Sequence, residues 1–266
     1  MDLRPILDGL VEKAKAQMVV EKGDYLQDGL LYCGKCHTPK QTRIKVGDYS
    51  SEPFCLCECQ KAAREADEKA RRIRKRREWC FDREKMREWT FDKDDGGTPK
   101  MTAIAKGYVD RFPEMLEKNR GLLFFGRTGV GKTFTACCIA NALIDRGYVC
   151  QFAEIPTEYD EVETFLSRIA YPDLLILDDF ASERNTEWMQ ETIKRVIDER
   201  YTARKPLIVT TNLTAEELKN TSDKQKARIY SRLFEMCFPV DFVGEERRRK
   251  SLNRDYAEYE AWLNGV

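Results

Sequence analysis

Residues 126–133 read Gly126-Arg127-Thr128-Gly129-Val130-Gly131-Lys132-Thr133, a full match to the pattern G-x-x-x-x-G-K-[ST]. The three glycines permit a tight turn whose backbone N–H groups point at phosphate oxygens. Lys132 is placed to reach the β- and γ-phosphates of a nucleotide, and the Thr133 hydroxyl to hold Mg²⁺. An apolar run at 122–125 precedes this loop and a helical pattern follows it. The order of strand, loop and helix N-terminus predicts a site for ATP and Mg²⁺.

The chain beyond residue 98 alternates between two hydrophobic periods. Strands are expected at 122–125, 148–153, 174–177 and 207–211, and helices at 100–118, 134–144, 158–169 and 187–201. Strands that alternate with helices of this length form a parallel sheet covered on both faces. The sequence therefore predicts an α/β fold, a three-layer nucleotide-binding domain.

Two of the expected strands end in polar side chains. Leu174 begins an apolar strand that ends in Asp178 and Asp179, and the strand from Leu207 ends at Asn212. Ligands of open α/β sheets bind beyond the carboxyl ends of the strands. We expect Asp178 to hold Mg²⁺, Asp179 to orient or deprotonate the attacking water, and Asn212 to touch that water and the γ-phosphate. The alternatives are two acids that cap the next helix and an asparagine that forms a turn.

Arginines follow the last of these strands. Arg228 and Arg232 are four residues apart and share one helical face, and 247–250 is a basic cluster. Guanidinium groups stabilise charge on a transferred phosphoryl group, often from a neighbouring subunit. The alternative is that these arginines are ordinary solvated surface charges.

Five of the ten cysteines lie between residues 33 and 59. Cys33 and Cys36 form a C-x-x-C pair, and Cys57 and Cys59 follow about 20 residues later, a spacing typical of tetrahedral Zn²⁺. These four are the expected zinc ligands, with Cys55 or His37 as substitutes. Unliganded thiols are the poorer explanation, because so short a segment could not bury a core without a metal.

Composition limits the possible partners. Lys plus Arg and Asp plus Glu both total 46, so no overall charge attracts nucleic acid or a membrane. No apolar run approaches the roughly 18 residues that span a bilayer. The first five residues show no secretory signal. A cytoplasmic location without a membrane partner is expected.

Three parts are expected along the chain: an N-terminal helix and zinc-binding module (1–60), a charged linker helix (61–97) and the nucleotide-binding domain (98–266). The amphipathic helix at 3–19 either offers an apolar face to a partner protein or packs on the zinc module. The basic run at 71–77 either follows single-stranded DNA or is simply solvated.

The order of four motifs resembles the DnaC/DnaI-type bacterial helicase loaders, which share a branch of the AAA+ ATPases with the transposition helper IstB. These motifs are the phosphate loop, 174–179, Thr210-Thr211-Asn212 and Arg228-Ile229-Tyr230-Ser231-Arg232-Leu233. The resemblance covers about Thr98 to Lys250. The N-terminal cysteine segment is similar to phage and prophage versions of these loaders.

This resemblance implies a AAA+ P-loop domain that self-associates, so that an arginine of one subunit completes the site of its neighbour. It makes Asp178 and Asp179 the hydrolytic pair, Asn212 the first sensor, Arg232 the finger and Arg228 its helper. It makes Arg248 the second sensor, with Arg247 as the alternative.

The implied function is ATP-dependent loading of a replicative DNA helicase onto DNA, with hydrolysis of ATP to ADP and phosphate and binding of single-stranded DNA. The alternatives are a transposition helper ATPase of the IstB type, or a zinc-ribbon nucleic-acid-binding adaptor whose nucleotide site only senses ATP.

Overall fold

The computed structural model describes residues 20–47, 49–155, 161–180, 187–247, 259–260 and 262–264. The helix expected at 3–19 and Arg248 lie outside these residues. The chain forms two compact units that meet in sequence between Arg72 and Ile73.

The N-terminal unit contains two antiparallel hairpins. Strand β1 (Tyr25–Gln27) pairs with β2 (Leu30–Tyr32), and β3 (Ile44–Val46) pairs with β4 (Tyr49–Ser51). Asp28 and Gly29, which join β1 to β2, both have positive φ, of 50° and 78°. Such a pair forms the two-residue turn whose twist matches that of the flanking strands. The Asp-Gly dipeptide therefore sets the register of the first hairpin.

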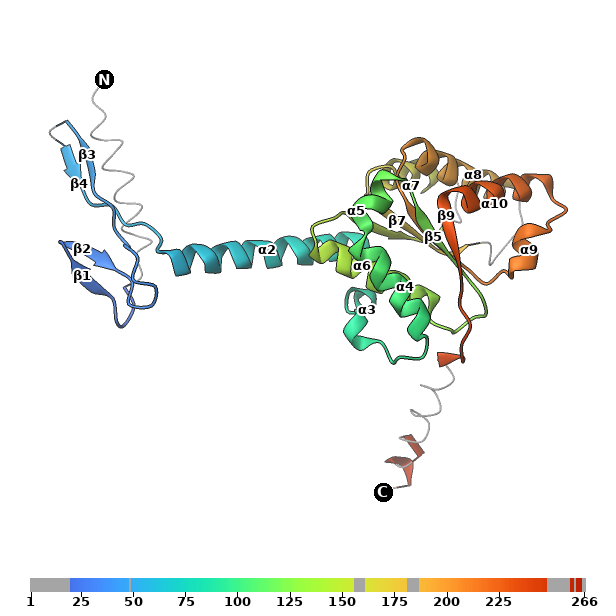
Figure 1. The fold of residues 1–266 in the computed structure, drawn as a ribbon, viewed down its shortest axis with the longest axis horizontal. Helices are drawn as coiled ribbons and strands as arrows, with labels where there is room; N and C mark the ends of the chain where they lie inside the picture. The colour runs from blue at the N-terminus through green and yellow to red at the C-terminus, as the bar shows by residue number, and fades with distance from the viewer. Residues whose placement is uncertain are drawn as a thin grey trace. The chain divides into compact units, whose positions relative to one another are not determined.

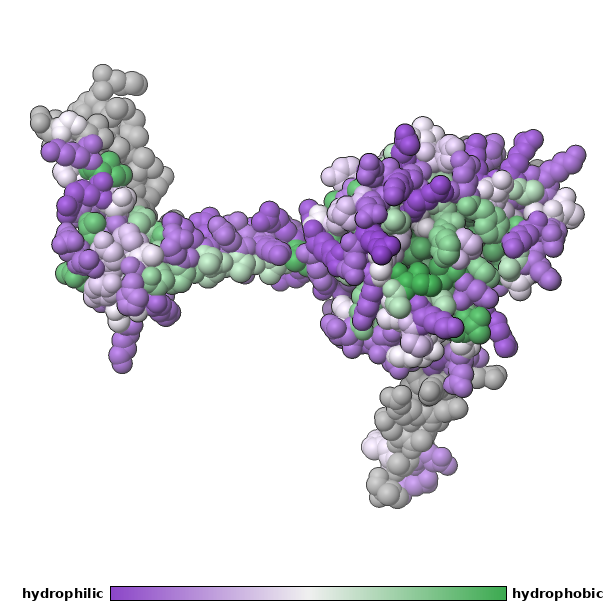
Figure 2. All heavy atoms as spheres, viewed as in Figure 1, coloured by the Kyte–Doolittle hydropathy of each residue, from purple (hydrophilic) through white to green (hydrophobic). Residues whose placement is uncertain are grey.

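Helix α2 (Glu58–Cys80) follows the hairpins. In the view of Figure 2 its upper side is hydrophilic and its lower side is weakly apolar, and ion pairs such as Arg64–Glu68, at 3.0 Å, run along it. The charged linker helix expected over 61–97 ends earlier, at Cys80, because Cys80 and Phe81 are buried in the core of the second unit. Two short helices, α3 (Glu84–Arg87) and η1 (Phe91–Lys93), follow. No helix among the described residues combines the length and apolarity needed to cross a bilayer.

The second unit is built on a five-stranded parallel sheet (Figure 1). Its strands are β5 (Gly121–Phe125), β6 (Cys150–Ala153), β7 (Leu174–Phe180), β8 (Leu207–Thr211) and β9 (Cys237–Asp241). The order across the sheet is β6-β7-β8-β5-β9. The strands that the sequence predicts are β5 to β8, and all pair in parallel.

Strand β9 was not predicted from the sequence. It lies at the edge of the sheet and pairs with β5, with Pro239 opposite Leu123. Proline lacks the N–H that a central strand must donate on one side, so it is tolerated at an edge. The proline concealed this strand in the sequence pattern.

Helices cover both faces of the sheet. On one face lie α4 (Pro99–Asp110), α5 (Phe112–Glu117) and α6 (Lys132–Asp145), and on the other α7 (Val162–Ile169), α8 (Glu187–Thr202) and α10 (Lys224–Met236). A short helix, α9 (Ala215–Lys219), precedes α10. Strand residues alternate between the two cores: Leu122 and Phe124 belong to one and Leu123 to the other. The predicted three-layer α/β fold is confirmed.

The helix expected at 100–118 is two helices, α4 and α5, which meet at Arg111. The cause is Pro113, whose missing N–H leaves the Val109 carbonyl without its helical donor. Arg146 Nη1 donates to that carbonyl at 2.5 Å, beside a backbone N–H at the end of α4. A side chain from the end of α6 thus closes the break.

A buried cation joins three chain segments on the second face. Arg200 of α8 is fully buried, and its guanidinium donates to the carbonyl oxygens of Ile169 (2.9 Å), Pro172 (2.8 Å) and Pro206 (2.6 Å). Burial lowers the pKa of Arg200 to about 10. These carbonyls lie at the end of α7 and ahead of β7 and β8, so Arg200 fixes where two central strands begin.

Candidate functional site

The phosphate-binding loop joins the end of β5 to the first turn of α6. Gly126, Gly129 and Gly131 all have positive φ, of 132°, 83° and 101°, a conformation that strains other residues. Space also excludes a side chain, since a Cβ at position 126 would lie 2.6 Å from Phe242 O. The loop conformation therefore requires glycine at these three positions.

Lys132 lies inside this loop and is 7 % exposed. Its Nζ donates to the carbonyl oxygens of Gly126 (2.7 Å) and Arg127 (2.8 Å) and to Asn212 Oδ1 (2.9 Å). The ammonium group is therefore fixed beside backbone N–H groups that can bind phosphate. Its link to Asn212 brings together two residues that the sequence assigned to one site.

Asp178 lies between two hydroxyl groups. Thr133 Oγ1 donates to Asp178 Oδ1 at 2.9 Å, and Thr210 Oγ1 donates to the same atom at 2.6 Å. Burial raises the pKa of the Asp178 carboxyl above its usual 3.8, although the two hydroxyl groups act in the opposite direction. A carboxylate and a hydroxyl in contact beside the phosphate loop are ligands that suit Mg²⁺. The residues present therefore fit the ion.

Asp179 owes its position to an irregularity in β7. The register of β7 against β8 shifts between Leu177 and Phe180, and Asp179 has a φ of 53°. A bulge of this kind bends the strand and redirects its side chains. Asp179 Oδ1 accepts a hydrogen bond from Asn212 Nδ2 at 3.0 Å. Both acids are thereby presented at the same edge of the sheet.

Sequence reasoning gave Thr210 no role, yet it holds this bulge in place. Its hydroxyl donates to Asp178 Oδ1 and accepts from the backbone N–H of Asp179 at 3.0 Å. Thr210 comes from β8, so the contact depends on the strand order. The available signal was its place in the Thr-Thr-Asn motif at the end of a buried strand.

A cavity of about 740 Å³ opens over these residues, within the range of about 300–1,000 Å³ usual for small-molecule sites. Its lining includes the predicted Thr128, Gly129, Gly131, Lys132, Thr133, Asp178, Asp179 and Asn212. Trp89 and Phe134, with ring centroids 5.8 Å apart, line another part of it. The cavity therefore offers both a phosphate site and an aromatic wall.

Arg228 and Arg232 of α10 do not line this cavity. Arg232 forms an ion pair with Asp198 of α8, and its guanidinium lies 5.5 Å from the centre of the Tyr201 ring. The predicted finger and its helper are thus not brought to the nucleotide site of their own chain. Arg247, the alternative second sensor, does line the cavity.

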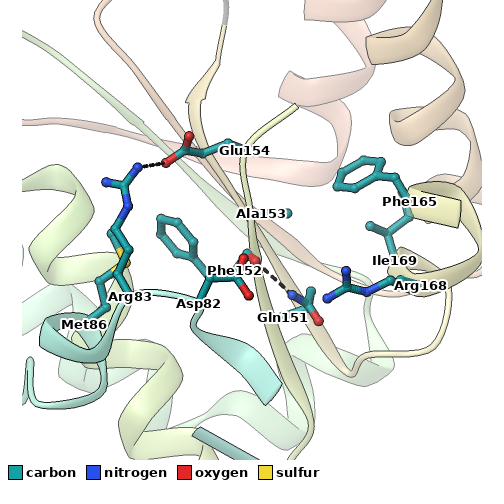
Figure 3. Close-up of a pocket in the computed structure, with 10 residues that line it drawn as sticks. All are labelled: Asp82, Arg83, Met86, Gln151, Phe152, Ala153, Glu154, Phe165, Arg168 and Ile169. Carbon is teal, nitrogen blue, oxygen red and sulfur yellow. Dashed lines mark hydrogen bonds and ion pairs between the residues drawn. The ribbon is translucent and has the colours of Figure 1, made fainter. Parts of the chain in front are cut away.

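A second cavity of about 220 Å³ lies beside edge strand β6 (Figure 3). Arg83 and Glu154, paired at 2.9 Å, line both cavities. Gln151 Nε2 donates to Phe152 O at 2.9 Å within the smaller one. No residue of the phosphate loop reaches it.

Four cysteines of the N-terminal unit gather at one point. The Sγ atoms of Cys33, Cys36, Cys57 and Cys59 all lie within 4.8 Å of one another, and those of Cys57 and Cys59 are 3.3 Å apart. Four sulfur atoms at about 2.3 Å from one Zn²⁺ would be about 3.8 Å apart. The four thiols that the sequence selected therefore fit a zinc ion.

A buried ion pair supports the first cysteine pair. Lys40 Nζ lies 2.5 Å from Asp24 Oδ2, and this hydrogen bond lowers the pKa of Asp24 to about 2. Asp24 Oδ1 accepts from the backbone N–H of Gly34 at 3.1 Å. A Cβ at position 34 would lie 2.2 Å from Gly23 O. Close backbone contact therefore requires glycine between the two cysteines.

The two substitute ligands have other contacts. Cys55 Sγ donates to Pro39 O at 3.6 Å, and His37 Nδ1 lies 3.3 Å from the Tyr25 hydroxyl. Neither belongs to the group of four sulfur atoms.

Comparisons with known proteins point to one kind of protein. A family model described as novel STAND NTPase 3 matches residues 105–256. Over 150 residues the chain is 29 % identical to the replicative helicase loader DnaI of Bacillus subtilis (strain 168), covering 49 % of this chain and 48 % of DnaI. It is 25 % identical over 132 residues to the replicative helicase loader DnaC of Escherichia coli (strain K12), covering 45 % and 53 %.

The chain spans about half the length of these curated relatives. A crystal structure of DnaI has a TM-score of 0.52 at 22 % identity and covers 62 % of this chain and 96 % of that one. At this identity the likeness shows the fold, that of the AAA+ P-loop domain. The predicted resemblance to DnaC/DnaI-type loaders is confirmed.

Proposed function

The chain belongs to the novel STAND NTPase 3 family, and on that premise we propose that it is an ATPase that loads a replicative helicase onto DNA. The observation that carries the ATPase part is the group of contacts among Lys132, Thr133, Asp178, Asp179 and Asn212. The similarity to DnaI and DnaC supports the loading part.

Lys132 and the backbone N–H groups of the phosphate loop bind the triphosphate in this proposal. Thr133 and Asp178 hold Mg²⁺, which would neutralise phosphate charge when bound. The two threonine hydroxyls donate to Asp178, and within the described part of the chain its Oδ2 has a single hydrogen bond, from Thr133 at 3.2 Å. Asp178 therefore retains an oxygen for a metal-bound water.

Asp179 and Asn212 orient the attacking water. Asn212 donates to Asp179 and accepts from Lys132, so one amide fixes the acid relative to the ammonium group. As the water attacks the γ-phosphorus, the bond from that phosphorus to the β–γ bridging oxygen breaks, ADP leaves, and Asp179 accepts the proton of the water. The side chain of Asp179 is one methylene shorter than that of Glu, the other acid that could hold the attacking water. We therefore expect slow ATP turnover, which suits a protein that acts as a timing switch.

Self-association supplies the arginines. Arg232 lies outside the cavity of its own chain, which supports a role at the nucleotide of another copy. Arg232 acts there as the finger and Arg228 as its helper, which makes hydrolysis depend on assembly. Arg248, outside the described residues, and Arg247 are the candidates for the second sensor.

The N-terminal part, residues 1–60, binds the helicase in this proposal. Cys33, Cys36, Cys57 and Cys59 hold Zn²⁺, which fixes the two hairpins around one point. The three parts of the chain in this proposal are 1–60, 61–97 and 98–266, and the helix expected at 3–19 offers a further partner surface. The basic run 71–77 follows single-stranded DNA.

One experiment tests the proposal as a whole. Tagged full-length protein is incubated with host lysate and Mg·ATP, and captured proteins are identified together with ATP turnover and fluorescence anisotropy of a labelled single-stranded oligonucleotide. Wild type should capture a hexameric helicase and hydrolyse ATP, Lys132→Ala should lose turnover, and the exposed Lys100→Ala should match wild type. Capture of a transposase, or turnover in Lys132→Ala equal to wild type, contradicts the proposal.

A further inference from the structure

Arg247 contacts the phosphate-binding loop directly. Its backbone N–H donates to Gly129 O at 2.9 Å. Its guanidinium lies against Gly131, because a Cβ added at that position would be 3.0 Å from Arg247 Cζ. The side chain also lines the large cavity. A positive charge from the C-terminal part of the chain therefore lies where phosphate is expected.

Two carboxylates hold the same guanidinium. Arg247 Nη1 lies 3.1 Å from Asp94 Oδ1 and 3.0 Å from Asp95 Oδ1, and Nη2 donates to Thr98 Oγ1 at 2.5 Å. The side chains of Arg247 and Asp94 are 17 % and 8 % exposed. The pair with Asp94 is shielded from water and is therefore screened less than a surface pair, whereas the Asp95 side chain is 53 % exposed. Arg247 therefore anchors the segment 94–98, which leads into α4.

The guanidinium is not fully satisfied by these partners. Arg247 Nε is buried and has no hydrogen-bond partner in the described part of the chain. Guanidinium matches phosphate in a two-bond geometry, and a terminal phosphate offers three oxygens. A nucleotide phosphate can therefore compete with the carboxylates for this group.

We propose that a nucleoside triphosphate and the acidic pair Asp94–Asp95 compete for Arg247. This inference rests on the proposed function of the site. Without nucleotide the acidic pair holds Arg247 and the segment 94–98 is anchored. A terminal phosphate draws Arg247 away, and the segment loses its anchor. A diphosphate lacks that group and leaves Arg247 on the acids, so the segment distinguishes ATP from ADP.

The first test measures binding of Mg·ATP and Mg·ADP to the full chain by calorimetry. Asp94→Asn with Asp95→Asn removes the competitor, so the ATP dissociation constant should fall about fivefold, at the lower end of typical couplings between sites. The ADP constant should not change. Asp92→Asn, an exposed acid nearby that does not line the cavity, is the matched control and should behave as wild type.

If the acids simply repelled the phosphate, the Asn substitutions would also tighten ATP binding. A double-mutant cycle separates the two causes. In an Arg247→Gln background, the Asn substitutions should no longer affect ATP binding if the acids act through Arg247. A gain that persists there overturns the inference, as does unchanged or weaker ATP binding by the Asn variant. Circular dichroism verifies that each variant is folded.

Hydrogen exchange gives an independent readout. Amides of 94–98 should exchange faster with a non-hydrolysable ATP analogue than with ADP in wild type, and equally fast with both in Arg247→Gln. Equal exchange in wild type overturns the inference. If Lys132→Ala binds nucleotide as wild type does, the proposed function fails and takes this inference with it. If binding depends on Lys132 but the acids have no effect, this inference alone fails.

Discussion

The side-chain amide of Asn212 donates to Asp179 Oδ1 at 3.0 Å. The same amide accepts from Lys132 Nζ through its oxygen, which fixes its orientation, since an ammonium group can only donate and a carboxylate can only accept. Asn212 is exposed and directly follows β8, whereas Asp179 belongs to the bulge of β7. The pair therefore links two strand ends at the mouth of the cavity.

Asn212→Ala should lower ATP turnover about 100-fold, the usual cost of removing one aligned polar group from a reaction site. Stability should change by less than about 0.5 kcal/mol because the side chain is exposed. Turnover is measured by phosphate release and stability by thermal melting. Asn220→Ala, at the exposed end of α9, is the control and should leave both unchanged. Equal turnover by the two variants would remove Asn212 from the mechanism.

Asp178→Asn should stabilise the fold while it abolishes hydrolysis. Burial raises the pKa of this carboxyl above 3.8, so the group favours the folded state below its unfolded pKa, and this contribution is lost as pH rises through the folded value. At pH 7 the ionised group therefore costs stability. Asn keeps an oxygen for both threonine donors and carries no charge. The melting temperature should rise by about 2–4 °C, which corresponds to a gain of about 1 kcal/mol in the free energy of unfolding.

The pH dependence provides the control for Asp178→Asn. Melting is measured in EDTA from pH 7 downward for wild type and variant. The difference should shrink as pH falls through the raised pKa, because the wild-type carboxyl then becomes neutral too. A difference that stays constant, or a less stable variant at pH 7, would show that the carboxylate charge does not destabilise the fold.

Cys57→Ser should abolish zinc binding, whereas Cys55→Ser should not. Cys57 belongs to the group of four sulfur atoms and Cys55, two residues earlier, does not. Zinc content of the purified full chain is measured by mass spectrometry, with one ion per chain expected for wild type and Cys55→Ser and close to none for Cys57→Ser. Loss of zinc from Cys55→Ser alone would mean that Cys55, and not Cys57, is the fourth ligand.

The sequence predicted the fold and the phosphate-binding part of the cavity because these depend on local patterns. The phosphate loop, the buried strands and their polar ends are contiguous motifs, and parallel strands bring such ends to one edge. The contact of Thr210 with Asp178 was missed because it depends on which strands are neighbours. The contact of Arg247 with Asp94 joins residues that are 153 positions apart in the sequence. No local periodicity of the sequence could predict it.

Arg200→Met should destabilise the domain by about 3 kcal/mol, because three buried carbonyls lose their donors. The variant keeps an unbranched stem as far as the position of Nε, so the loss reports the hydrogen bonds together with the space that the rest of the guanidinium fills. Denaturation in urea gives the free energy of unfolding. Arg204→Met, an exposed arginine after the same helix, should change it by less than about 0.5 kcal/mol. Equal effects of the two substitutions would mean that the buried hydrogen bonds make no net contribution to the free energy of unfolding.

Lys132→Ala and Arg232→Ala should each lack ATP turnover alone and regain it when mixed. If Arg232 acts on the nucleotide of another copy, a mixed assembly contains sites with an intact phosphate loop from the Arg232→Ala protomer and an intact finger from the Lys132→Ala protomer. The ion pair of Arg232 with Asp198 is partly exposed, so its loss should leave the fold intact.

A mixture of Lys132→Ala with Asp178→Asn is the control for this complementation. Both substitutions damage the half of the site that one protomer supplies, so no arrangement of the two restores a whole site. Phosphate release is measured as a function of the mixing ratio at fixed total protein. Turnover should peak at an intermediate ratio for the first pair and stay at background for the second. A flat response in both mixtures would mean that Arg232 does not complete a neighbour's site.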